Sequence, residues 1–378
     1  MRDAWQLDDS IHFLNQGSYG ATPRVVLEKQ RALRDQLEAE PVRFMVRERE
    51  PLLDLARARL ADFVGAQRED LVFVTNATTG VNAVLRSLDF EPGDELLTTS
   101  HGYNACTNTL SYVAERTGAN VVIADVPFPV ESSEVLAQAV LDAVTSRTRL
   151  VLLDQITSPT ALVFPIARLV RELEGRGVPV LVDAAHAPGH VPLSLDATGA
   201  SYTTGNLHKW VCAPKGAAFL HVRRELQALI RPPVISHGAN SKRTDRSRFQ
   251  LEFDWVGTAD PTAVLCVPTA LDFMASLVPG GWPALMALNQ AEVIAARAVL
   301  LEQLEQPLPC PPELLGSMAS VVVPNAPPNL GERLFKEFRI EVPVIPFGGQ
   351  TLLRISMQRH VRRGDVPALA AALRAMGS

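Results

Sequence analysis

Val178-Pro-Val-Leu-Val-Asp183 is a short apolar run that ends in an aspartate and leads into Ala184-Ala-His186. Consecutive apolar residues without polar alternation are typical of a strand that is buried on both faces of a parallel sheet. In open α/β sheets, ligands bind at the carboxyl ends of the strands, which is where Asp183 is expected. The segment therefore predicts a buried strand with a carboxylate at a ligand-binding edge. The alternative is that Asp183 only caps a strand-to-helix turn.

Five further apolar runs between residues 70 and 222 have the same character. Segments with helical spacing, such as 105–115 and 166–175, separate them. This alternation predicts a three-layer α/β domain with a mostly parallel sheet. The runs are Leu71–Thr75, Glu95–Thr99, Asn120–Ala124, Arg149–Asp154 and Gly216–Val222.

The flanking segments have other patterns. A polar, proline-containing stretch at 231–258 predicts a long functional loop, and the proline-rich stretch 307–312 is expected to open a small C-terminal α/β unit. Helical spacing predicts helices over 24–38, 51–64, 261–277 and 282–304.

Composition narrows the class of protein. The chain has 378 residues, 47% of them hydrophobic, and a net charge of −5, which argues against a nucleic-acid partner. The four cysteines are widely spaced, so neither a metal site nor a disulfide framework is expected. The N-terminus lacks the pattern of a signal peptide, and no run of apolar residues is long enough to predict a membrane span. We therefore expect a soluble, cytoplasmic protein.

Lys209 is one of only five lysines and lies in an unusual context. The segment Tyr202-Thr-Thr-Gly-Asn-Leu-His-Lys-Trp210 places it among small and apolar residues. A lysine is rarely buried unless it is paired or used in chemistry. Desolvation lowers its pKa toward the neutral amine that forms Schiff bases. The alternative is a solvated lysine at a surface turn.

Three more segments carry groups suited to a ligand. Val74-Thr-Asn-Ala-Thr-Thr-Gly-Val-Asn82 follows a strand and opens a helix, so its amides and hydroxyls could hold a phosphate, unless Asn76 or Thr78 is an ordinary cap. Tyr103, directly after a strand, could stack on a planar ring or simply pack. Arg354, in the apolar segment Leu353-Arg-Ile-Ser356, could bind a carboxylate or form a structural ion pair.

Together these groups match what a phosphorylated pyridine aldehyde and an amino acid would need. Sites for pyridoxal 5'-phosphate use a Schiff-base lysine and a charged partner for the pyridine nitrogen. A phosphate cradle, an aromatic platform, a strand-end aspartate, a sequestered lysine and a late arginine follow one another along this chain. We therefore expect pyridoxal 5'-phosphate as the cofactor.

Several motifs are shared with a known family. They are Phe13-Leu-Asn-Gln-Gly-Ser-Tyr-Gly20, Asn76-Ala-Thr-Thr79, Ile156-Thr-Ser-Pro-Thr160, Val182-Asp-Ala-Ala-His186, Asn206-Leu-His-Lys-Trp210 with Pro214-Lys-Gly216, Gly257-Thr-Ala-Asp260 and Leu353-Arg-Ile-Ser356. Over nearly its whole length the sequence resembles the class V, fold-type I pyridoxal-phosphate enzymes, in the branch named for isopenicillin N epimerase. The resemblance implies a large α/β domain over 17–258 with a mostly parallel seven-stranded sheet. Residues 1–16 and 259–378 would form a smaller α/β domain.

The resemblance also implies a role for each matching residue. Lys209 would bind the cofactor covalently, Asp183 would pair with its pyridine nitrogen, and His186 would lie near its phenolic oxygen. Tyr103 would stack on the ring, and Arg354 would bind the substrate carboxylate. The remaining expected site residues are Ala77, Thr78, Asn206 and His208 around the phosphate, Thr258 reaching the phosphate from the second subunit of a homodimer with shared active sites, and Asn15 and Ser158 in the substrate pocket.

The expected substrate is an amino acid or a small molecule derived from one. Loss of the Cα proton can lead to epimerisation, transamination or elimination from Cβ, and all three use the same residues. The branch favours an epimerase or racemase, with a class V aminotransferase or a carbon–sulfur lyase as alternatives. A cofactor-binding but inactive homologue is the non-enzyme alternative. Related cysteine desulfurases carry a nucleophilic cysteine shortly before the late arginine, but 344–353 contains none, so persulfide transfer is disfavoured.

Overall fold

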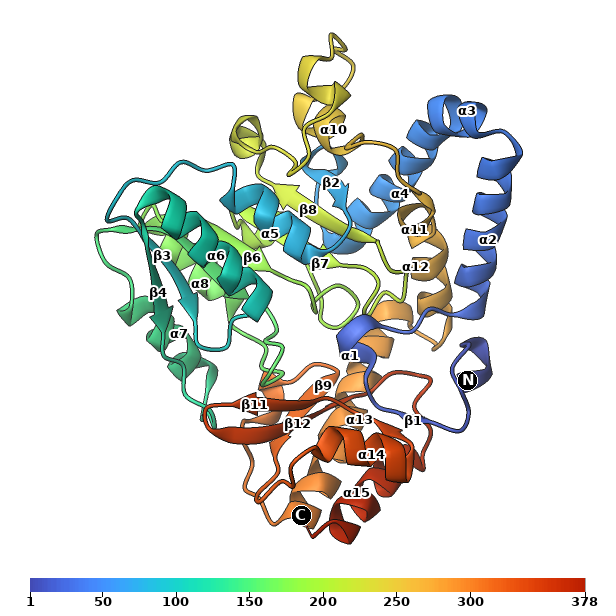
Figure 1. Cartoon of the computed structure of the whole chain (residues 1–378), viewed down its shortest axis with the longest axis vertical. Coiled ribbons are helices and arrows are strands. Elements are labelled where there is room, and N and C mark those ends of the chain that lie inside the picture. Colours follow the sequence, from blue (N-terminus) through green and yellow to red (C-terminus); the bar gives the residue numbers. More distant parts are fainter. Residues whose placement is uncertain (378) are drawn as a thin grey trace.

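A seven-stranded sheet forms the centre of the large domain in the computed structural model, which describes residues 1–377 (Figure 1). The strand order is β2-β8-β7-β6-β5-β3-β4; β8 runs antiparallel to both of its neighbours, β2 and β7, and the other neighbouring strands are parallel to each other. The prediction of a mostly parallel seven-stranded sheet is therefore confirmed. The strands are β2 (Leu71–Val74), β3 (Glu95–Thr99), β4 (Asn120–Ala124), β5 (Thr148–Asp154), β6 (Val180–Asp183), β7 (Tyr202–Asn206) and β8 (Ala218–Val222).

β7 is the strand that the apolar pattern did not predict. Its sequence, Tyr-Thr-Thr-Gly-Asn, is largely polar, yet all five residues are buried. The Thr204 hydroxyl donates a hydrogen bond of 2.7 Å to the carbonyl oxygen of Phe219 on β8. Because the hydroxyl is satisfied within the sheet, a polar strand can lie at its centre without a large desolvation cost.

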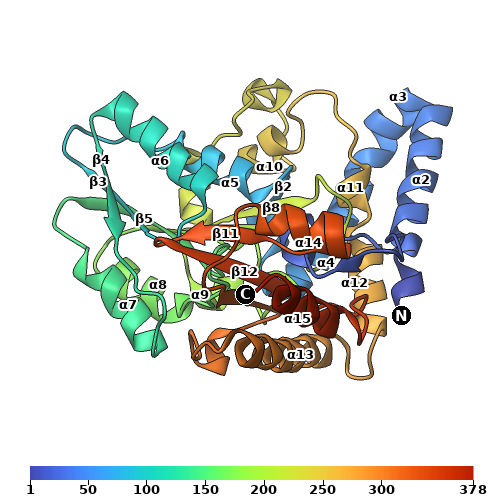
Figure 2. The ribbon, with the colours of Figure 1, turned by 60° about the horizontal axis from the view of Figure 1, so that its bottom comes forward.

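Helices cover both faces of this sheet. Leu152 and Leu181 pack with Leu110 of α6 (Asn104–Thr117), whereas the adjacent Val151 and Val182 pack on the other face in the hydrophobic core that contains α8 (Ile166–Gly175). Figure 2 shows α5 and α6 on one side of the sheet and α7 and α8 on the other. The remaining helices of this part are α1 (Gln16–Tyr19), α2 (Arg24–Ala39), α3 (Pro41–Arg43), α4 (Arg49–Val64), α5 (Ala77–Leu85), α7 (Ser133–Asp142), α9 (Leu195–Thr198) and α10 (Arg248–Phe253).

Two predicted segments differ in detail from the structure. The helix expected over 261–277 is divided into α11 (Thr262–Leu265) and α12 (Val267–Ser276), because Pro268 has no amide hydrogen to continue the helical hydrogen bonds. The loop expected over 231–258 contains the 3-10 helix His237–Asn240 as well as α10.

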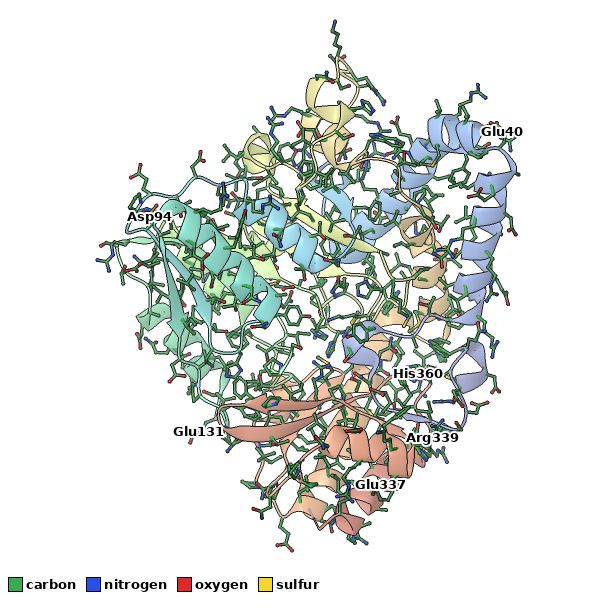
Figure 3. The ribbon with its side chains drawn as sticks, viewed as in Figure 1. Glu40, Asp94, Glu131, Glu337, Arg339 and His360 are labelled. Carbon is green, nitrogen blue, oxygen red and sulfur yellow. The ribbon has the colours of Figure 1, made fainter. Side chains whose placement is uncertain are left out.

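The C-terminal part forms a second, antiparallel sheet of β11 (Val344–Phe347), β12 (Gln350–Ser356) and β9 (Met318–Val322). The N-terminal strand β1 (His12–Phe13) pairs with β10 (Ile340–Glu341), so the two ends of the chain are joined. His360, labelled in Figure 3, bonds to Gln16 through Nε2 at 2.9 Å. The helices here are α13 (Gly281–Leu304), α14 (Leu330–Phe338) and α15 (Asp365–Ala375).

Helix α13 has the length and apolar composition of a membrane-spanning helix. It nevertheless contributes Val293, Leu300 and Leu304 to the hydrophobic core that also contains β9 and α15. The apolar side chains of α13 thus pack within the fold.

Candidate active site

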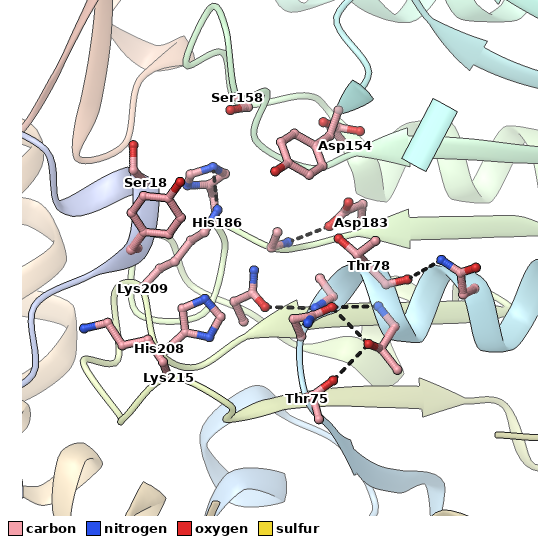
Figure 4. Close-up of a pocket in the computed structure, with 18 of the residues that line it drawn as sticks. Ser18, Thr75, Thr78, Asp154, Ser158, Asp183, His186, His208, Lys209 and Lys215 are labelled. Atoms are coloured by element: carbon pink, nitrogen blue, oxygen red, sulfur yellow. Dashed lines mark hydrogen bonds between the residues drawn. The ribbon is translucent and has the colours of Figure 1, made fainter. Parts of the chain in front are cut away.

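A cavity of about 650 Å³ lies at the carboxyl ends of β5, β6 and β7, beside the start of α5 (Figure 4). Ser18 and Tyr19 of α1 also line it, so the N-terminal segment contributes to the wall. The cavity brings together nine of the residues expected from the sequence. They are Ala77, Thr78, Tyr103, Ser158, Asp183, His186, Asn206, His208 and Lys209.

Lys209 reaches the cavity from the loop that follows β7. Its Nζ lies 3.1 Å from His186 Nε2, and among residues 1–377 no carboxylate lies within ion-pair distance of the amine. Burial, assisted by the positive charge of Arg354, lowers the Lys209 pKa to about 8, while Asp183 and Asp154 oppose this shift. The site thus holds an amine that is easily obtained in its neutral, nucleophilic form.

The hydrogen bonds of His186 favour a neutral Lys209. The indole Nε1 of Trp210 donates to His186 Nδ1 at 3.4 Å, and an indole nitrogen can only donate. Burial lowers the pKa of His186 well below its usual value, which favours a neutral ring, and the Trp210 bond to Nδ1 assigns the ring proton to Nε2. That proton points to Lys209 Nζ, which can accept it only as a neutral amine.

Asp183 ends β6 as a buried carboxylate with defined partners. Its Oδ1 accepts the backbone N–H of Ala185 at 2.9 Å, and its Oδ2 accepts the thiol of Cys106 at 3.2 Å. Burial raises the pKa of Asp183, whereas these two hydrogen bonds and Lys209 lower it. The Ala185 bond is the local bond that a capping aspartate makes, so Asp183 combines a turn-stabilising role with a place in the cavity wall.

Asp154 is a cavity residue that the sequence analysis did not select. It ends β5 directly beside Asp183, in register with it, and is 6% exposed. Burial and the neighbouring Asp183 charge raise its pKa well above the usual range. The signal in the sequence is the same as for Asp183, an apolar strand that ends in aspartate.

The first turn of α5 forms the opposite wall. Asn76 caps this helix by accepting the Thr79 amide at 2.8 Å, and Gly80 lets the helix approach β7, because a Cβ there would lie 2.1 Å from Thr204 Oγ1. The Ala77 amide is bonded to Asn206 Oδ1 at 2.9 Å.

Two cations that the sequence analysis did not select, Arg86 and Lys215, also line this part of the cavity. A helix N-terminus with basic side chains is suited to an anion.

Arg354 lies on β12 and is 2% exposed. It donates to the Ser158 carbonyl at 2.6 Å, to Ser158 Oγ at 3.0 Å and to Ser18 Oγ at 3.3 Å. Within residues 1–377 it has no acidic partner, so the alternative of a structural ion pair is wrong. Burial lowers the Arg354 pKa to about 10. The guanidinium is held by two residues of the cavity wall, and its charge is not neutralised by the protein.

Arg354 is not itself among the residues that line this cavity, and two other expected residues lie outside it as well. Asn15 lines a neighbouring cavity, where it donates to Glu341 Oε1 at 3.0 Å, while its own Oδ1 is buried without a partner. Thr258 is exposed and does not line the cavity of its own chain. Its neighbours Gly257 and Ala259 line an adjoining pocket that shares Thr75, Thr79 and Gly216 with the cavity.

Comparisons with known proteins agree with this geometry. A family model described as aminotransferase class-V matches residues 12–314. The chain is 35% identical to an isopenicillin N epimerase of Amycolatopsis lactamdurans, with 99% of this chain and 97% of that protein aligned. It is 28% identical to an L-cysteine desulfhydrase of Arabidopsis thaliana, with 89% and 78% aligned.

Solved structures share the fold. A cystine C–S lyase in complex with its product cysteine persulfide superposes with a TM-score of 0.82 at 23% identity, over 97% of both chains. A cysteine desulfurase of Escherichia coli superposes with a TM-score of 0.81 at 20% identity, over 100% of this chain and 97% of the other.

Proposed function

Because the chain belongs to the class V aminotransferase family, and is therefore a pyridoxal-phosphate-dependent enzyme, we propose that it acts at Cα of an α-amino acid as an epimerase or racemase. The bound cofactor supplies an electron sink for the charge that develops at Cα when its proton leaves. The protein must supply the cofactor's anchor, the substrate clamp and the groups that move protons.

The residues of the cavity fit this cofactor. Lys209 offers a buried amine of lowered pKa for the covalent link, and Asp183 offers a carboxylate for the pyridine nitrogen. The start of α5, with Thr78, His208 and Lys215, offers amides, a hydroxyl and positive charge for the phosphate. His186 holds Lys209 in place through the 3.1 Å contact.

The buried position of Arg354, without an acidic partner among residues 1–377, is the observation that indicates the substrate class. A buried guanidinium without an acidic partner is costly unless an anion binds it, and a carboxylate matches its planar pair of donors. Ser158 and Ser18 fix the side chain, so the substrate carboxylate would be oriented relative to Lys209. Lys209, whose lowered pKa makes the neutral amine accessible, would serve as the general base for the Cα proton.

No cysteine side chain of the protein is placed to act as a nucleophile in the cavity. All four cysteines are buried, and none lines the cavity. Residues 344–353 form the hairpin of β11 and β12, with Gly348 and Gly349 at positive φ in its turn and no cysteine. The site therefore lacks the nucleophilic thiol that transfer of a persulfide would require. Elimination from Cβ needs no such thiol, and the desulfhydrase relative makes carbon–sulfur lysis the second candidate.

We further propose a homodimer in which Thr258 completes the partner's phosphate site. In support, Thr258 is exposed and absent from its own cavity wall.

One experiment distinguishes the reactions. Single enantiomers of a panel of amino acids, including cysteine, are incubated with the holoenzyme in D2O and separated by chiral chromatography. Epimerisation predicts the opposite enantiomer with deuterium at Cα. Release of ammonia and sulfide from cysteine without the opposite enantiomer would favour the lyase. Absence of both solvent exchange and product across the panel would contradict the proposal.

A further inference from the structure

Asp154 and Asp183 stand side by side at the carboxyl ends of β5 and β6, in register with each other. Their exposed fractions are 6% and 3%, and both line the cavity, as Figure 4 shows. The proposed function gives a role to Asp183 alone. Two adjacent buried carboxyl groups at one site raise the question of how many negative charges they carry.

The charged groups around the pair do not neutralise two carboxylates. Within residues 1–377 neither aspartate forms an ion pair: Lys209 bonds to His186, and Arg354 bonds to serines. His186 is neutral because its pKa is lowered, and the Cys106 thiol and the Tyr103 phenol stay protonated because burial raises their pKa values. Like charges in neighbouring buried positions disfavour double ionisation, so one carboxyl retains its proton.

The hydrogen bonds show which one retains it. Asp183 accepts bonds from the Ala185 amide and the Cys106 thiol, and both stabilise a carboxylate. The Asp154 carboxyl, in contrast, accepts one bond, from the Tyr103 backbone N–H, and its Oδ1 is buried without a hydrogen-bond partner. A carboxylate oxygen in that position would be strongly unfavourable, whereas a carboxylic acid costs much less. The negative charge therefore resides on Asp183.

We propose that Asp154 and Asp183 form an acid–carboxylate pair with a single negative charge, the proton residing on Asp154, and that the pair as a unit supplies the charge for the cofactor nitrogen. The inference rests on the proposed role of Asp183 toward that nitrogen. It has a specific consequence: when Asp183 is made neutral, the repulsion that keeps Asp154 protonated disappears, and Asp154 can supply a replacement charge.

A double-mutant cycle on cofactor affinity tests this without measuring turnover. The dissociation constant of pyridoxal 5'-phosphate is determined by absorbance titration of the apoprotein for wild type, Asp154→Asn, Asp183→Asn and the double variant. Because the amide resembles a neutral acid, Asp154→Asn should stay within about 3-fold of wild type. The fold loss of affinity in the double variant should exceed the product of the fold losses in the two single variants, by roughly 3-fold or more. A loss equal to that product would overturn the pair.

Infrared difference spectra of the apoproteins give a second readout. At neutral pH, wild type minus Asp154→Asn should show the C=O stretch of a protonated carboxyl. Asp70→Asn is a matched control, because buried Asp70 forms an ion pair with Arg224 at 2.9 Å and should give no such band. Absence of the Asp154 band would overturn the proposal, provided circular dichroism shows the variant folded. If neither Asp183→Asn nor the double variant changed cofactor affinity, the role of Asp183 toward the cofactor nitrogen would fail, and the infrared spectrum would still decide whether Asp154 carries the proton.

Discussion

Replacing Arg354 by lysine should remove the preference for substrates with a carboxylate. The lysine keeps the positive charge but loses the planar pair of donors that matches a carboxylate. It also loses the three hydrogen bonds to Ser158 and Ser18 that orient the guanidinium. A weakly oriented cation would bind the substrate less well and align its Cα–H bond less well, so both KM and kcat should be affected.

The size of the effect follows from the hydrogen bonds at stake. A hydrogen bond to a charged group contributes about 1.5–3 kcal/mol. The Arg354 guanidinium would make two such bonds to the substrate carboxylate, and a lysine can replace only one of them. Losing one such bond in the transition state lowers kcat/KM by roughly 10- to 150-fold. Each assay compares an amino acid with the amine that lacks its carboxylate, for wild type and variant. The loss should fall on the amino acid, and the amine should be poorly used by both proteins.

Arg297→Lys is the matched control. Arg297 is 1% exposed on α13, donates to the Cys310 carbonyl at 2.8 Å and does not line the cavity. Its replacement should lower the melting temperature without changing the ratio of amino acid to amine turnover. Equal use of both substrates by the wild-type enzyme would refute the clamp. So would an Arg354→Lys variant that, like Arg297→Lys, lost stability but kept its substrate preference.

Three further results are expected. Asp183→Asn should lose most turnover with little loss of melting temperature, because the amide carries no charge and a replacement charge on Asp154 would lie on the neighbouring strand, away from the position of Asp183; near-normal turnover with a large loss of stability would instead identify a capping residue. A Thr258→Ala chain mixed with a Lys209→Ala chain should regain activity, since one hybrid site then has both residues, and a fully active monomer in sedimentation would exclude shared sites. The rate of cofactor capture by the apoprotein should rise with pH and level off above about 8, where the lowered pKa of Lys209 leaves the amine neutral; a rate that still rises up to the usual lysine pKa would show that the amine is not desolvated.

The strands with apolar sequences were predictable. β3, whose five residues are all buried, has the bounds expected from its run, and so does the edge strand β4, although only Ala124 of β4 is buried. β7 was missed because its polar side chains are satisfied by partners such as the Phe219 carbonyl, which no local pattern reveals. Pro268 was visible in the sequence and does divide the expected helix at Cys266.

The site was predictable as far as it depends on strand ends. Asp183 and Lys209 meet because parallel strands present their carboxyl ends at one edge. Asp154 carries the same strand-end signal and could have been selected. The placement of Asn15 beside Glu341, away from the cavity, depends on the pairing of β1 with β10 at opposite ends of the chain, for which the sequence offers no local signal.

The central claim is that Lys209 carries the cofactor, and the cavity contains one competing amine. Lys215 also lines it, with its Nζ bonded to the Gly20 carbonyl at 2.8 Å and its pKa lowered by burial. The direct measurement is borohydride reduction of the holoenzyme, followed by proteolysis and mass spectrometry of the labelled peptide. We predict that the cofactor mass lies on Lys209 and that Lys209→Ala gives no labelled peptide. A label on Lys215 in the wild-type protein would contradict the account.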